Sequence, residues 1–281
     1  MTAPLLNIEL ARRIELAEAQ AAVGGAETMR RLRPESGAAV EPIAGGFAIY
    51  CGANSPTTQA VGMGLDGPVN DEEFDRLENF YGSRSEPVRV ETCPLADASL
   101  IGHFGKRGYR VTEFSNVMAL SLDRESGLEN WEGPLPGVGI EQVGHGPIDL
   151  WTLTVSQGFA EKGPVVPEIV DVMKMFALSV GVECYLARVD GKVAGGGTLA
   201  IRDGVAGLFG ASTLPAFRRR GVQAALLHAR LARAAEAGCD LAVCLAQPGS
   251  TSQRNIVRRG FTVLYTRVKF ERELYSSNPA Q

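Results

Sequence analysis

The chain has 281 residues, 45% of them hydrophobic and 21% charged, a balance typical of a folded soluble protein with one large domain or two of ordinary size. The formal net charge of -4 gives no reason to expect nucleic acid as a partner. The five cysteines form no CxxC pair and lie at no metal-ligand spacing from the three histidines, so we expect no bound metal and free thiols in a reducing compartment. No apolar run approaches the roughly 20 residues of a membrane helix, and the N-terminus lacks the apolar core of a signal peptide. We therefore expect a cytoplasmic protein without a membrane partner.

The first half of the chain predicts a long helix followed by a mixture of strands and helices. Residues 5–32 carry apolar side chains at three- and four-residue spacing, interrupted by Gly24 and Gly25, and Pro34 follows the end of this helix. The segments GGFAIYCG and TQAVGMGL predict short strands, and the acidic segment NDEEFDRLENFYGSR predicts a helix. VRVETC predicts a strand, ADASLIGHFGKRGY a helix that ends at Gly108, and VTEFSNVMALSL a long strand.

A linker follows the long strand. The segment DRESGLENWEGPLPGVGIEQ is rich in Gly, Pro and acidic residues and shows no periodicity, which is typical of a domain boundary. We place the boundary near residues 123–137 and predict two domains, residues 1–130 and residues 131–281.

The second half predicts similar elements in a similar order. WTLTVSQGF and PEIVDVMKMFALS predict helices, and VECYLARVDGKVAGGGTLAIRDGVAGLFGAST predicts three strands joined by two Asp-Gly hairpin turns. A helix over residues 222–237, the strand CDLAVCLAQ, a helix over residues 252–259 and the strand FTVLYTRVKFER follow.

The two halves also end alike. FGKRGYRVTEFSNVMAL and IVRRGFTVLYTRVKFER both run from a helix through Arg-Gly-aromatic into a long strand, and Gly108 and Gly260 are 152 residues apart (260 − 108 = 152). Glycine commonly follows helix ends in mixed folds, which is the simpler explanation. The matching order of the preceding elements favours a duplicated chain.

The most informative segment is GLFGASTLPAFRRRGVQAALLHARLARAAEAG. A strand ends at about Thr213, a loop holds Pro215 and three consecutive arginines, and Gly221 opens a helix with Arg230 and Arg233 on its polar face. A helix N-terminus attracts anions through unpaired N–H groups and the macrodipole, and glycine lets a phosphate approach the main chain. A triple arginine alone is more often a solvated surface, but with this glycine and helix the expected ligand is a pyrophosphate.

The run RRRGVQAALL resembles the acyl-CoA signature of the GNAT acetyltransferases, which is an Arg or Gln, two variable residues, Gly, one variable residue, then Gly or Ala. Arg218 and Gly221 match this pattern. Gln223 replaces the last Gly or Ala, which puts one backbone amide contact in doubt, although its side chain can donate instead.

A second segment, SQRNIVRRGF, resembles the later family motif in which an Asn near a helix start contacts the cofactor and a Gly-Phe begins the final strand. Asn255 and Gly260-Phe261 occupy these places, and the resemblance covers roughly residues 150–272. It implies an α/β fold (an α+β mixed sheet) of two tandem GNAT-like domains, each a central, mostly antiparallel sheet flanked by helices. It also implies acetyl-CoA or another acyl-CoA as co-substrate. The expected cofactor contacts are Gly210, Ala211, Ser212, Thr213, Arg218, Arg219, Arg220, Gly221, Val222, Gln223, Ala224 and Asn255.

The N-terminal half resembles the same fold without its phosphate loop. No Arg-x-x-Gly lies between QAVGMGLDG and DEEFDRLENF, and Asp66, Asp71, Glu72 and Glu73 crowd this junction instead. Acidic side chains repel a pyrophosphate. We therefore predict that this half does not bind CoA and serves as a scaffold or as a wall of the substrate site.

For the chemistry, the resemblance implies direct attack of a primary amine on the thioester, with the backbone of Gly210–Thr213 holding the pantetheine arm and polarising the carbonyl. The tyrosine that often protonates the leaving thiolate is replaced by Ile256, so Tyr265 is the nearest substitute, unless it only fills a strand face. Glu183 and Glu161 are candidate bases, although a surface carboxylate is the commoner explanation for each.

The sequence therefore predicts an acyl-CoA-dependent N-acyltransferase, most simply an N-acetyltransferase acting on a primary amine of a small molecule or peptide. Cys184 and Cys244 lie in predicted buried strands, where thiols are usually inert, so we expect no acyl-enzyme. The alternative is a non-catalytic acyl-CoA binding or sensing protein, which the missing tyrosine keeps open. A homodimer, the acyl chain and the amine are also left open.

Overall fold

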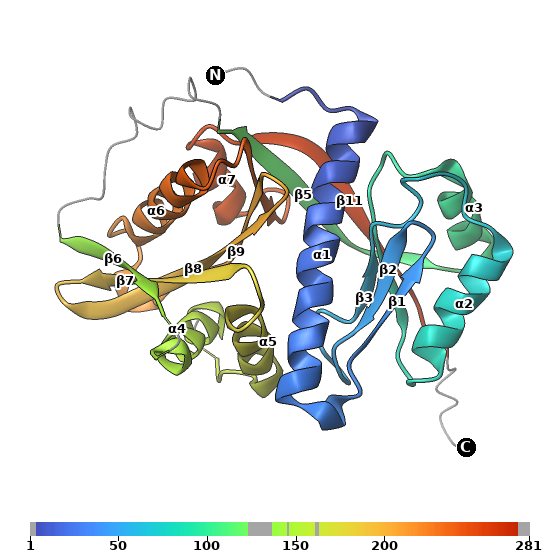
Figure 1. Cartoon of the computed structure of the whole chain (residues 1–281), viewed down its shortest axis with the longest axis horizontal. Helices are drawn as coiled ribbons and strands as arrows, with labels where there is room; N and C mark the ends of the chain where they lie inside the picture. The colour runs from blue at the N-terminus through green and yellow to red at the C-terminus, as the bar shows by residue number, and fades with distance from the viewer. Residues whose placement is uncertain (1–3, 123–136, 145, 161–162, 275–281) are drawn as a thin grey trace. The chain divides into compact units, whose positions relative to one another are not determined.

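The computed structural model describes residues 4–122, 137–144, 146–160 and 163–274, and this part of the chain forms two compact units (Figure 1). The N-terminal unit comprises residues 5–117, 246–253 and 263–274. The C-terminal unit contains the rest, chiefly residues 118–245 and 254–262. The predicted boundary between residues 130 and 131 falls in the segment 123–136, outside the described residues.

The N-terminal unit begins with the long helix α1 (Ile8–Leu32), whose N-cap Asn7 accepts a hydrogen bond from the Leu10 N–H at 2.8 Å. The prediction that Gly24 and Gly25 interrupt this helix was wrong, because the helix runs through both. A glycine costs a helix about 1 kcal/mol relative to alanine. The buried residues of α1 extend from Ala11 to Met29, on both sides of the two glycines, and the helix packs on strands of the unit, so tertiary packing offsets that cost.

The sheet of the N-terminal unit has the strand order β1-β2-β3-β4-β11-β5, of which β1 was not predicted. Its strands are β1 (Ala39–Ile43), β2 (Gly46–Tyr50), β3 (Gln59–Val61), β4 (Val88–Thr92), β5 (Arg110–Ser121) and β11 (Thr262–Arg272). β3 and β4 are parallel, and β4 and β11 are antiparallel. Helices α2 (Asp71–Gly82) and α3 (Ala98–Arg107) pack into a core around Phe74, Leu77 and Phe104.

The sheet of the C-terminal unit has the strand order β10-β9-β8-β7-β6 and is mostly antiparallel, as predicted. Its strands are β6 (Val138–Val143), β7 (Val182–Val189), β8 (Lys192–Arg202), β9 (Val205–Thr213) and β10 (Leu241–Ala246). The two Asp-Gly turns are confirmed, because Asp190, Gly191, Asp203 and Gly204 all have positive φ. The sequence predicted a linker over the residues of β6. Only its end residues, Val138 and Val143, are buried, so the strand lacks the alternation of apolar and polar residues that predicts a strand.

Helices cover both faces of this second sheet (Figure 1). They are α4 (Ile148–Ala160), α5 (Pro167–Ala177) and α6 (Val222–Glu236), and the short α7 (Thr251–Val257) follows β10 in the chain. Glycines in β8 allow the close packing: a Cβ on Gly196 would lie 2.9 Å from the Trp151 indole nitrogen of α4, and one on Gly197 would lie 3.0 Å from the Arg230 guanidinium of α6. Since successive residues of a strand face opposite sides, α4 and α6 lie on opposite faces.

The predicted common ending of the two halves is present. α3 ends at Gly108 with φ of 76°, and β5 follows. α7 is followed by Gly260 with φ of 87°, and then by β11.

Among the described residues, no helix combines the length and the apolar character needed to cross a membrane.

Candidate functional site

The N-terminus of α6 has the properties of an anion site. Gly221 is the N-cap with φ of 78°, and no side chain of the described chain caps this end. The first helical hydrogen bond runs from the Ala225 N–H to the Gly221 carbonyl oxygen at 3.0 Å. The N–H groups of Val222, Gln223 and Ala224 precede it and are therefore directed out of the helix with the positive end of its dipole.

The three arginines occupy the loop immediately before this helix end, and all three are exposed. Arg219 has φ of 63°, a left-handed conformation that is rare without glycine and is often found at functional sites. The Arg220 guanidinium pairs with the Asp190 carboxylate at 2.7 Å, so part of its charge is already balanced. The loop nevertheless carries an excess of positive charge beside the open helix end.

Gln223, the residue that departs from the family pattern, is held by Asn255. The Asn255 Nδ2 donates to the Gln223 Oε1 at 2.7 Å, which joins the start of α6 to α7. The structure thus brings together two residues that the sequence placed in separate motifs. The amide nitrogen of Gln223 keeps its own N–H donors, so its predicted contact with the cofactor stays a prediction.

Next to this helix end, β9 and β10 part. Their parallel pairing extends from Val205↔Leu241 to Leu208↔Cys244, and in the described chain it does not continue to the last residues of β9, 209–213. On the opposite edge, these residues pair with β8 through a bulge at Gly210, whose φ is 56°. The edge that faces β10 therefore offers unpaired backbone N–H and C=O groups to an extended ligand.

The side chain of Ser212 within this segment is already engaged. Its Oγ donates to the Val155 carbonyl oxygen of α4 at 2.9 Å, and a Cβ on Gly158 would lie only 2.3 Å from that oxygen. Gly158 thus lets α4 approach the end of β9. Any ligand contact of Ser212 would come from its backbone.

The candidate base Glu183 lies at the start of β7 and is held on both sides. Arg233 of α6 contacts one carboxylate oxygen at 2.9 Å, and the Tyr185 hydroxyl donates to the other at 2.7 Å. Both oxygens of the Glu183 carboxylate are therefore engaged by neighbouring side chains. Burial, followed by the neighbouring Glu183, raises the pKa of Tyr185 above its ordinary value. The other candidate base, Glu161, lies outside the described residues.

Tyr265, the candidate acid, lies in the N-terminal unit and is 6% exposed. Its hydroxyl donates to the Glu15 Oε1 at 2.7 Å, and the same oxygen accepts from the Arg267 Nε at 2.8 Å. Burial and then the nearby Glu15 raise the pKa of Tyr265. The described contacts thus give Tyr265 a partner inside its own unit, and proton transfer by this residue stays a prediction.

The two strand cysteines of the C-terminal unit are buried and free. Burial raises the pKa of both Cys184 and Cys244 to about 12. Because the thiolate is the reactive form, few molecules would carry a nucleophilic cysteine here at neutral pH. Neither thiol is therefore suited to nucleophilic attack at neutral pH.

The structure corrects one further expectation about α6. Arg230 was placed on an exposed polar face, but it is 3% exposed and lies against β8, where its Nη1 donates to the Thr198 carbonyl oxygen at 2.9 Å. The sequence signal for this burial is the run of three glycines that contains Gly197, which leaves room for a large side chain from the facing helix.

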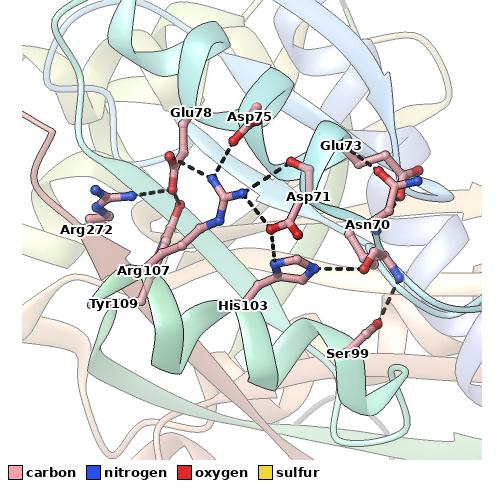
Figure 2. Close-up of polar contacts among 11 residues, drawn as sticks. Asn70, Asp71, Glu73, Asp75, Glu78, Ser99, His103, Arg107, Tyr109 and Arg272 are labelled. Atoms are coloured by element: carbon pink, nitrogen blue, oxygen red, sulfur yellow. Dashed lines mark hydrogen bonds and ion pairs between the residues drawn. The ribbon is translucent and has the colours of Figure 1, made fainter.

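The N-terminal unit has a helix end of opposite character at α2, drawn in Figure 2. Asn70 and Glu73 form a capping box: the Glu73 N–H donates to the Asn70 side chain at 2.9 Å, and the Asn70 N–H donates to the Glu73 carboxylate at 3.0 Å. The first turn also carries Asp71 and Glu72. The donors that an anion would need are thus partly used, and the site is negatively charged.

A basic residue of α3 balances these acids (Figure 2). The Arg107 guanidinium contacts Asp75 at 2.6 Å, Asp71 at 3.0 Å and Glu78 at 3.2 Å. The hydrogen bond from Arg107 is the main reason that the pKa of Asp71 lies below its ordinary value. The Nδ1 of His103, also on α3, lies 3.4 Å from the Asp71 carboxylate. This arrangement holds α2 to α3.

The sequence profile of the Acetyltransferase (GNAT) family matches residues 156–261 of this chain, a range that begins in α4 and ends at Phe261, before β11. The chain therefore contains a domain of the GNAT acetyltransferase family, whose members transfer acyl groups from acyl-CoA. No curated protein matches the sequence.

Solved structures with similar folds extend the likeness over most of the chain. A GCN5-related N-acetyltransferase from Kribbella flavida shares 17% identity with a TM-score of 0.65 and covers 93% of this chain and 95% of its own. A tandem GNAT protein from the clavulanic acid biosynthesis pathway shares 14% identity with a TM-score of 0.61, covering 86% and 80%. A functionally unknown conserved protein from Staphylococcus epidermidis ATCC 12228 shares 13% identity with a TM-score of 0.53, covering 73% and 81%. At these identities the likeness concerns the fold.

Proposed function

We propose that this protein is an N-acetyltransferase that binds acetyl-CoA, or another acyl-CoA, at the N-terminus of α6 and along the unpaired end of β9. The observation that carries the proposal is the uncapped helix end at Gly221, which lies directly after the strand whose pairing with β10 stops at Leu208. Phosphates suit the helix end, and an amide-containing pantetheine arm suits the free strand edge.

The reaction that fits these groups is direct attack of a primary amine on the thioester carbonyl. The bulge at Gly210 turns backbone groups of β9 out of the ladder with β8, and one of their N–H groups would stabilise the oxyanion. Arg233 and Tyr185 engage both oxygens of Glu183, so the ammonium proton would leave through water or a group of the acceptor site. Several contacts are proposed for the cofactor; besides the backbone of 210–213 and 222–224, they are Arg218, Arg219, Arg220, Gln223 and Asn255.

The acceptor is proposed to be a primary amine of a small molecule or a peptide. The two units are proposed to be tandem domains of which only the C-terminal one binds CoA. The five buried free cysteines accord with action in the reducing cytoplasm.

The alternative proposal is that the protein binds acyl-CoA without catalysing a reaction. It is supported by Ile256 at the place of the expected tyrosine and by the engagement of both Glu183 and Tyr265 with other side chains.

Turnover separates the two functions. Acetyl-CoA binding is measured first by calorimetric titration, and release of the CoA thiol is then followed over a broad panel of primary amines. The enzyme should show binding and amine-dependent thiol release. Binding without release on any amine would favour the sensor, and no binding at all would contradict both.

A further inference from the structure

The C-terminal unit contains a buried arginine without a carboxylate partner among the described residues. Arg230 donates from Nε to the Leu226 carbonyl oxygen at 3.0 Å and from Nη1 to the Thr198 carbonyl oxygen at 2.9 Å. Both acceptors are neutral. Two of the five N–H donors of the guanidinium are used in this way, which leaves three (5 − 2 = 3). A buried cation without an opposing charge destabilises the fold, so the presence of Arg230 at this position requires an explanation.

The buried arginine of the other unit shows what full compensation looks like. Arg267 contacts Glu15 at 2.8 Å, Glu18 at 2.7 Å and Glu91 at 3.4 Å. Burial opposes its charge, but these carboxylates together raise the pKa of Arg267 well above the ordinary value. Burial instead lowers the pKa of Arg230 to about 10, which leaves it a cation at neutral pH. Arg230 is thus a retained charge that the described protein does not neutralise.

The position of Arg230 indicates where its counter-ion would lie. A Cβ on Gly197 would lie 3.0 Å from the Arg230 Cζ and 3.4 Å from the Ala211 Cβ, so the guanidinium and the bulge of β9 meet around the empty side-chain position of Gly197. Ala211 is exposed and lies beyond the last pair of β9 with β10, formed by Leu208. The guanidinium therefore lies beside the segment at which the two strands have parted.

This position is too far along α6 to serve the phosphates. Arg230 follows Val222 by eight residues (230 − 222 = 8), which is about 12 Å along the helix axis. An anion bound by Arg230 would therefore be a different one and would lie at the bulge, where the proposed function places the thioester.

We infer that Arg230 stabilises the thiolate that leaves the acyl-CoA thioester, an inference that rests on the proposed function. In that step the amine nitrogen attacks the carbonyl carbon, the new C–N bond forms, and the C–S bond breaks with its electron pair on sulfur. The amine proton passes to water, and the thiolate beside the guanidinium takes a proton from solvent. A cation stabilises a thiolate without donating a proton, which suits a chain with Ile256 in place of the expected tyrosine.

The test is the ionisation of CoA itself bound to the protein. Thiolate absorbance of the CoA complex is followed against pH, with the desulfo-CoA complex as the blank that removes the protein's own thiols and phenols. A free thiol ionises at about pH 8.5. In the wild-type complex a guanidinium next to the sulfur should lower that midpoint by about one pH unit or more. In Arg230→Met the midpoint should return to the value of free CoA, and an unchanged midpoint in this variant would overturn the inference.

Two further variants, Arg230→Gln and Arg233→Met, serve as controls for misfolding and for the loss of a neighbouring charge. Arg230→Met removes a buried charge and keeps a long side chain, so its melting temperature should equal or exceed that of the wild type. Should this variant not fold, Arg230→Gln keeps N–H donors for the Thr198 carbonyl without the charge, and it must lose the shift as well. Arg233→Met removes the neighbouring arginine that Glu183 already neutralises, and it should leave the midpoint as in the wild type.

Activity provides the second readout. Arg230→Met should lower kcat on acetyl-CoA by about 100-fold, the typical effect of removing one group that stabilises developing negative charge. Its affinity for CoA should stay near that of the wild type, since the phosphates are bound elsewhere. Failure of wild-type protein to bind CoA would remove the proposed function and this inference together. CoA binding with an unshifted thiol would remove this inference alone.

Discussion

In each half of the chain, one helix connects two parallel strands: α2 runs between β3 and β4, and α6 runs between β9 and β10. In each half, a residue five positions before the left-handed glycine of the next helix contacts the first turn of that connecting helix. His103 (108 − 103 = 5) lies 3.4 Å from Asp71, and Asn255 (260 − 255 = 5) donates to Gln223 at 2.7 Å.

The two connecting helices differ at their first turns. α2 begins with a capping box and acidic residues, so its free N–H groups and its dipole are used within the protein. α6 begins with Gly221 and no side-chain cap, after a loop of three exposed arginines. A helix end that caps itself stabilises its own fold, whereas one that is left uncapped keeps its donors for a ligand.

The largest effect is expected from Gly221→Asp. The φ of 78° disfavours any residue with a Cβ, and the new carboxylate would lie where the phosphates should bind. Acetyl-CoA affinity, measured by calorimetry, should fall by about 100-fold or more, the equivalent of about 2.7 kcal/mol.

Gly238→Asp is the matched control. Gly238 follows the other end of α6 and has φ of 79°, and a Cβ at this position would meet no described atom within 4 Å, so the variant bears the same backbone strain and the same added charge. Its affinity for acetyl-CoA should be that of the wild type. Equal losses in both variants would mean that strain in α6, and not the anion site, explains the effect.

A smaller loss is expected from Gln223→Ala. This change removes the side-chain amide that is proposed to replace the expected backbone contact, and it breaks the bond to Asn255. A hydrogen bond to a charged group is worth at least about 1.5 kcal/mol, so affinity for CoA should fall by at least about tenfold. Gln253→Ala is the control: Gln253 lies in α7, and its side chain accepts a hydrogen bond from the Gly249 N–H. Titration should find the CoA affinity of this variant unchanged.

At α2 the expected effect is on stability alone. Asn70→Ala should lower the free energy of unfolding by about 1 kcal/mol, because the capping box is lost. By calorimetry the melting temperature should fall by about 2–4 °C, with acetyl-CoA affinity unchanged. Asn7→Ala removes the comparable cap of α1 and should behave in the same way. Weaker CoA binding by Asn70→Ala would show that α2 takes part in the site.

The smallest effect concerns the pH dependence of Asp71. The hydrogen bond from Arg107 holds the pKa of Asp71 below its ordinary value of 3.8. Its carboxylate therefore stabilises the folded chain above that value, and this contribution is lost as pH falls through the lowered pKa. The melting temperatures of wild type and Asp71→Asn should differ at about pH 6 and converge as pH falls below the lowered pKa of Asp71. A difference that stays constant over this range would contradict this account of Asp71.

Much of the fold could be predicted because local patterns carried it. Glycine at positions 108 and 260 marked the helix ends, and the Asp-Gly pairs marked the hairpins, since each needs positive φ. The edge strand β6 was not predicted because few of its side chains are buried. The continuity of α1 through Gly24 and Gly25 depends on tertiary packing, which no local propensity reports.

The candidate site likewise has features that the sequence predicted and others that it could not predict. Its helix end follows from a short motif, since Arg218, Gly221 and Gln223 are close in sequence. The partners of Glu183 and Tyr265 come from residues 50 and 250 positions away (233 − 183 = 50; 265 − 15 = 250) and could not be seen in the sequence. The burial of Arg230 was missed for a related reason, because the space that accepts its side chain is made by Gly197 in β8.

Amide hydrogen exchange with and without CoA tests the central difference between α2 and α6 most directly. The N–H groups of Val222, Gln223 and Ala224 precede the first hydrogen bond of α6 and should become strongly protected on binding. Those of Asp71, Glu72 and Glu73 in α2 should exchange at the same rate in both states. Unchanged exchange over 222–224 in CoA-saturated protein, or new protection over 71–73, would contradict the account.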